Sequence, residues 1–90
     1  MATANIIWGA AKGGMPVFSS DFESENIAGG STTTDPVPAN SIVRVTAIDG
    51  AVYAAFGTAA TADPRVYVAA GASIDVHRTE AGDVSIETYA

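Results

Sequence analysis

The C-terminal half of the chain alternates apolar and polar residues with a period of two, from residue 41 to residue 89. Successive side chains of a β-strand point to opposite faces, so this period predicts strands that each bury one face. Five runs share the pattern: residues 41–48, 51–56, 65–70, 73–78 and 84–89. In the first run, Val43, Val45 and Ala47 are expected inside.

Turn signals separate these runs. Asp49-Gly50 lies between two alternating runs and predicts a β-hairpin, because a type I′ turn needs positive φ at both central residues. Residues 80–83 (Glu-Ala-Gly-Asp) predict another hairpin, and Gly57 and Gly71 end two further runs. Residues 41–90 are therefore expected to form an antiparallel β core.

Residues 1–40 are expected to be an N-terminal arm with accessory strands, joined to the core by a connector with two prolines. The apolar run Ile6-Ile7-Trp8 has two interpretations. It is either a first strand that caps the sandwich or an arm whose Trp8 enters a pocket on a neighbouring protein. Residues 15–20 and 31–34 predict edge strands, the first because Pro16 cannot donate to a β-ladder.

The expected fold class is all-β: one domain, a small antiparallel β-sandwich or barrel, jelly-roll-like, with about 6–7 short strands and an N-terminal arm. A chain of 90 residues buries only roughly 60–65% of its unfolded surface. The sequence has no cysteine, so no disulfide supports this small core. We therefore expect stabilisation by oligomerisation or by docking on a larger partner.

Charge and hydropathy argue against two classes of partner. The net charge is −6, and the four basic residues are scattered along the chain. Nucleic acids and anionic membranes both require clustered cations, so neither is an expected partner. No apolar run approaches the roughly 20 residues of a spanning helix, and the N-terminus lacks the pattern of a secretory signal.

No catalytic residue, cofactor site or metal site is predicted. Asp21, Glu23 and Glu25 could offer oxygen ligands to Ca²⁺, but they lack the glycine and the later glutamate of an EF-hand, which favours a solvated strand face. His77 is the only histidine and lies on the expected outer face of a strand, where a surface role is the simpler interpretation. An enzyme is therefore the least favoured class.

Three tyrosines, Tyr53, Tyr67 and Tyr89, could form a row on the outside of the core. Such a row could stack against a sugar or a nucleobase. The alternative is that these tyrosines are half-buried residues that pack across strands or at an interface.

The chain resembles the small β-rich virion proteins of tailed bacteriophages. The segments that carry the resemblance are residues 24–27, the Ser/Thr tract at 31–34, residues 43–47, residues 52–57 with the loop that follows, and residues 79–86. The resemblance implies a capsid cement or decoration protein, made in the host cytoplasm, that bridges neighbouring major capsid subunits, often as a trimer. It lies in strand pattern and style, without a diagnostic motif.

The first functional hypothesis is therefore a non-enzymatic virion structural protein on the capsid surface. Its expected contacts with the partner are the apolar residues of the N-terminal part: Ile6, Ile7, Trp8, Val17, Phe18 and Phe22. The second hypothesis is a carbohydrate-binding or adhesion β-module displayed on a particle surface, with the tyrosines as its ligand contacts.

Overall fold

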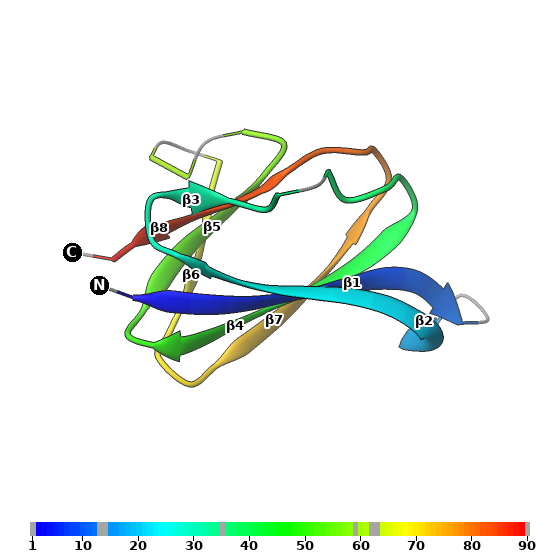
Figure 1. Cartoon of the computed structure of the whole chain (residues 1–90), viewed down its shortest axis with the longest axis horizontal. Helices are drawn as coiled ribbons and strands as arrows, with labels where there is room; N and C mark the ends of the chain where they lie inside the picture. The colour runs from blue at the N-terminus through cyan, green and yellow to red at the C-terminus, as the bar shows by residue number, and fades with distance from the viewer. Residues whose placement is uncertain (1, 13–14, 35, 59, 62–63, 90) are drawn as a thin grey trace.

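The chain folds into two antiparallel four-stranded sheets that pack against each other as a β-sandwich (Figure 1). The computed structural model describes residues 2–12, 15–34, 36–58, 60–61 and 64–89, and its description of side chains leaves out residues 10–22 as well. The first sheet contains β1 (Thr3–Lys12), β2 (Met15–Ala28), β4 (Ser41–Asp49) and β7 (Ser73–Arg78), in the order β2-β1-β4-β7. The second contains β3 (Ser31–Thr32), β5 (Val52–Phe56), β6 (Val66–Val68) and β8 (Val84–Thr88), in the order β3-β8-β5-β6.

The all-β fold class is confirmed, and of the two expected architectures the structure is the sandwich. The described residues form eight strands, more than the six or seven expected. All five strands expected in the C-terminal half are present, and the limits of β7 agree with its run. The period-two pattern therefore located the strands well.

The core lies between the two sheets and is built mainly from small aliphatic side chains. Val43, Val45 and Ala47 of β4 are buried on the inner face, as expected. From the opposite sheet, Val52 and Ile86 meet them in one continuous cluster. Protein interiors are packed about as densely as organic crystals, and valine and alanine side chains fill the space between these two sheets.

For the Ile6-Ile7-Trp8 run the strand interpretation is correct, and the expectation of an N-terminal arm is wrong for residues 3–10. β1 lies inside the first sheet, paired with β2 on one side and with β4 on the other. Ala2, Ala4, Ile6 and Trp8 alternate inward and are all buried in the protein's own core. The alternation was present in the sequence, but alanine gives a weak hydrophobic signal, so only the Ile6-Ile7-Trp8 run stood out.

The two expected hairpins are also absent, because β4 and β7 belong to one sheet and β5 and β8 to the other. Asp49-Gly50 and residues 80–83 carry the chain from one sheet to the other. Gly50 has φ 86°, whereas Asp49 is not among the residues with positive φ, so the turn is not type I′. A positive-φ glycine indicates a sharp change of direction, and the sequence does not specify which sheet the chain enters next.

The β1–β2 hairpin continues beyond the rest of the first sheet. The pairing of β1 with β4 ends at Ala10, and beyond it β1 pairs, among the described residues, with β2 alone. β2 has 14 residues against 10 in β1, and the register shifts twice between Gly9 and Lys12. We call residues 11–12 and 15–21 the hairpin extension. It lies at the opposite end of the long axis from the two chain termini (Figure 1).

Candidate binding surface

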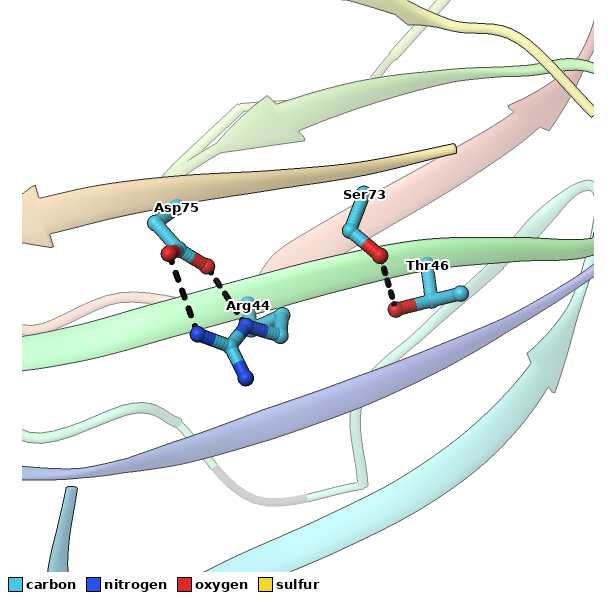
Figure 2. A network of polar contacts seen from close by, with 4 residues as sticks. All are labelled: Arg44, Thr46, Ser73 and Asp75. Atoms are coloured by element: carbon cyan, nitrogen blue, oxygen red, sulfur yellow. Dashed lines mark hydrogen bonds and ion pairs between the residues drawn. The ribbon is translucent and has the colours of Figure 1, made fainter. Parts of the chain in front are cut away.

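The outer face of the first sheet carries polar side chains that pair across the strands, beside apolar residues such as Ile7 and Ile42. Asn5 Nδ2 donates a 2.8 Å hydrogen bond to Asn26 Oδ1, and the hydroxyls of Thr46 and Ser73 are 2.8 Å apart (Figure 2). These four residues are register partners in a single row that crosses all four strands. The row is formed by cross-strand neighbours, which are the closest side-chain pairs on one face of a sheet.

The next row of this face contains an ion pair. Arg44 Nε donates to Asp75 Oδ1 at 2.7 Å, and Arg44 Nη2 donates to Asp75 Oδ2 at 3.1 Å (Figure 2). Hydrogen bonding from Arg44, supported by its positive charge, lowers the pKa of Asp75, and Asp75 in turn raises the pKa of Arg44. Both side chains are more than one-third exposed, so water screens the pair and its effect on stability is small.

The outer face of the second sheet carries a cluster of three tyrosines. Tyr53 and Tyr67 are register partners on β5 and β6, and their ring centroids are 6.2 Å apart. Tyr89 follows β8, and its ring lies 5.4 Å from that of Tyr53 and 4.9 Å from that of Tyr67. The interplanar angles of 68°, 54° and 69° are tilted or edge-to-face, as aromatic quadrupoles favour.

Two charged residues border this cluster. The guanidinium carbon of Arg65 lies 3.7 Å from the centroid of the Tyr53 ring, and Arg65 Nη1 donates to the Ala60 carbonyl at 3.3 Å. Glu87 is the register partner of Tyr53 on the β8 side, so its side chain shares the outer face with the tyrosine. We call Tyr53, Tyr67, Tyr89, Arg65 and Glu87 the tyrosine surface.

The tyrosine surface is more exposed to solvent than the rest of the outer face of its sheet. Farther along β5 and β8, the register partners Ala55 and Ser85 are buried although they point outward. By contrast, Tyr67 is 50% exposed and Tyr89 is 49% exposed. Large aromatic side chains with half of their surface in water offer an apolar contact area to a ligand.

The expected contact residues have very different positions. Ile6 and Trp8 are buried in the core, so the expectation that they contact a partner is wrong in this fold. Ile7 is half-buried and points to the outer face of the first sheet, opposite Arg44. The other three expected contacts, Val17, Phe18 and Phe22, lie on β2, and their side chains are outside the described part of the structure.

The remaining candidates for chemistry are consistent with surface positions. His77 is exposed on β7, and its register partner on β4 is Ile42. Glu23 is exposed, and Glu25 accepts hydrogen bonds from the backbone N–H and the hydroxyl of Thr34, at 2.9 and 2.7 Å. Within the described residues, no group of three or more histidine, cysteine or acidic side chains could hold a metal ion. The same residues contain no helix with the length and apolar character needed to cross a membrane.

Sequence reasoning suggested the tyrosine row but missed Arg65 and Glu87 as its neighbours. The outward positions of Tyr53 and Tyr67 could be read from the alternation. The contribution of Glu87 depends on the pairing of β5 with β8, which are separated by two other strands in the chain. No local pattern encodes such a long-range pairing.

Comparison of the chain with known protein families, with curated proteins and with solved structures gave no significant match. The tyrosine surface and the hairpin extension are therefore interpreted from their own chemistry and geometry.

Proposed function

We propose that this protein is a non-enzymatic structural protein of a tailed-phage virion, a cement or decoration protein that attaches to the capsid surface and bridges neighbouring major capsid subunits. The observation that supports the proposal is the hairpin extension, which pairs with no third strand among the described residues. A two-stranded hairpin alone is at best marginally stable in water. A neighbouring protein that packs on the extension, or adds a strand to it, would stabilise it.

In this proposal the attachment site is the hairpin extension, whereas the expected contacts Ile6 and Trp8 are buried in the core. Val17 and Phe18 belong to it, and Phe22 lies at its root, paired with Gly9. β2 is an edge strand of the first sheet, so its outer side offers backbone groups for an added strand. Many equivalent contacts over one shell would then sum by multivalency, without tight binding at any single site.

The proposal includes self-association, with a trimer as the favoured state. The small core favours an assembly that buries further surface. The test is the mass of the purified chain in solution by light scattering. A trimer has three times the 9.1 kDa of the chain, whereas a mass of 9.1 kDa at all concentrations contradicts this part of the proposal.

The experiment that tests attachment begins with virions of the phage that encodes the chain. Mass spectrometry of purified particles is expected to find the protein at a stoichiometric ratio to the major capsid protein. The chain's absence from intact particles would overturn the proposal.

A shortened variant then tests the extension. Replacing residues 10–21 by Asn-Gly closes the hairpin at the Gly9–Phe22 pair with a two-residue turn and keeps the central part of β1 in its sheet. We expect this variant to fold and to lose binding to particles that lack the protein. The matched control is Ile48→Ala, which removes an exposed side chain from the first sheet and should bind normally. Full occupancy by the shortened variant would show that the extension is not the attachment site.

A further inference from the structure

We propose that the tyrosine surface is a binding site for a neutral polysaccharide. This inference goes beyond attachment to a capsid and does not depend on it. It rests on three tyrosine rings with centroids 4.9 to 6.2 Å apart, two of them about half exposed, with a cation and a carboxylate on the same sheet face.

The chemistry of the surface matches that of a sugar ring. A pyranose has an apolar face of C–H groups and a rim of hydroxyls, and tyrosine likewise combines an apolar ring with a polar O–H group. Tyr67 and Tyr89 meet edge to face at an interplanar angle of 69°, and each residue is about half exposed. Glu87 supplies hydrogen-bond acceptors and Arg65 supplies donors, which are the groups that sugar hydroxyls require.

The size of the surface favours a sugar over a protein. The exposed parts of Tyr67 and Tyr89 amount to roughly 200 Å², since a tyrosine presents about 200 Å² in full and each of the two is about half exposed. A standard protein interface needs about 800 Å² from each partner, and its core is depleted of charged residues such as glutamate. An area of a few hundred Å² is instead enough for a small number of sugar rings.

The net charge of the chain favours a neutral polysaccharide over an acidic one. The net charge of the chain is −6, and within the surface the positive charge of Arg65 is matched by the negative charge of Glu87. An acidic polymer would be repelled over distances of about 10 Å at ordinary ionic strength, so uncharged chains are the expected ligands.

The position of the surface fits display on a particle. The hairpin extension and the C-terminal end of β8 lie at opposite ends of the long axis (Figure 1), and Tyr89 directly follows β8. A protein attached through its extension would therefore keep the tyrosines available at the other end. The same binding would occur with the free protein, so the two proposals can fail separately.

The test is affinity electrophoresis of the free chain in native gels that contain one polysaccharide each. Dextran, laminarin and galactomannan are the neutral probes, and alginate is the acidic one. We expect at least one neutral probe to retard the wild-type protein and alginate to leave it unretarded. Tyr67→Ala and Tyr89→Ala should each lower the association constant roughly tenfold, and the double variant should migrate as in a gel without polysaccharide.

Matched controls distinguish the loss of a tyrosine ring from a loss of the fold and from a change in self-association. Tyr67→Phe keeps the ring and should retain most of the binding, and Ile48→Ala on the other sheet should bind as the wild type does. Absence of retardation by all three neutral probes, or equal retardation of the double variant, would overturn the proposal. It would also be overturned if the double variant had a smaller mass in solution than the wild type, because the surface would then be a contact between copies of the chain.

Discussion

The outer faces of the two sheets differ in the interactions that their side chains make with one another. On the first sheet, polar groups pair with one another across the strands, as in Asn5 with Asn26 and Arg44 with Asp75. On the second sheet, the side chains that pair are tyrosines, and two of them remain half exposed. The first face therefore makes its hydrogen bonds internally, whereas the second offers apolar area together with charged neighbours.

This difference shows that one shared core can support two outer faces of different chemical character. Both faces depend on the same buried cluster, in which β1 contributes Ala4, Ile6 and Trp8. A change in the core should affect both faces together. A change on one outer face should leave the other intact, and the following experiments examine that separation.

The largest expected effect comes from the shared core. Trp8→Ala should lower the free energy of unfolding by about 3–5 kcal/mol, because it removes a large buried side chain and leaves a cavity. Its neighbour Ile7 points to the outside, so Ile7→Ala should cost less than about 1 kcal/mol. Urea unfolding followed by circular dichroism measures both. Equal small effects would mean that β1 is an arm after all.

A pair of threonine variants compares a buried hydroxyl with an exposed one. Thr33 is buried, and its Oγ1 accepts a 3.2 Å hydrogen bond from the Val84 N–H group, so Thr33→Val should cost about 1–3 kcal/mol. Thr46 bonds Ser73 on the exposed face, so Thr46→Val should change stability by about 0.5 kcal/mol or less. Thermal unfolding of the two variants provides the comparison. A larger loss for Thr46→Val would show that the polar row is a main source of stability.

A double-mutant cycle measures the tyrosine contact directly. Tyr53→Ala, Tyr67→Ala and the double variant should give a coupling energy of about 0.5–1.5 kcal/mol, the usual range for an edge-to-face pair. The same cycle on Thr46 and Ser73 is the control from the other face. Additive effects for the tyrosines would mean that their rings do not pack together in solution.

The smallest expected effect is the ion pair, and it depends on pH. The pKa of Asp75 is lowered in the folded protein, so the pair stabilises the fold above the ordinary aspartate pKa of about 3.9 and loses this effect as the pH falls through the folded value. Asp75→Asn should cost about 0.2–1 kcal/mol at pH 7. The difference from the wild type should shrink below pH 4 in denaturant titrations. A constant difference down to pH 2 would contradict this assignment.

The sequence predicted the positions of the strands better than it predicted which strands pair with each other. Alternation placed β4, β5, β7 and β8 almost to the residue, because each strand buries one face by itself. It could not distinguish a hairpin at Asp49-Gly50 from a crossing between sheets, because both need a sharp turn. The candidate binding surface was predictable only in part, since Glu87 is the register partner of Tyr53 through the pairing of two strands distant in the chain.

The difference between the two faces can be tested most directly by NMR. The protein labelled with ¹⁵N would be titrated with oligosaccharides prepared from the neutral polysaccharide that retards it. We expect the amide shifts to change at Tyr53, Tyr67, Glu87 and their neighbours on β5, β6 and β8, with the outer residues of β1, β4 and β7 unchanged. Shift changes centred on the polar face of the first sheet would contradict the assignment of ligand binding to the tyrosine surface.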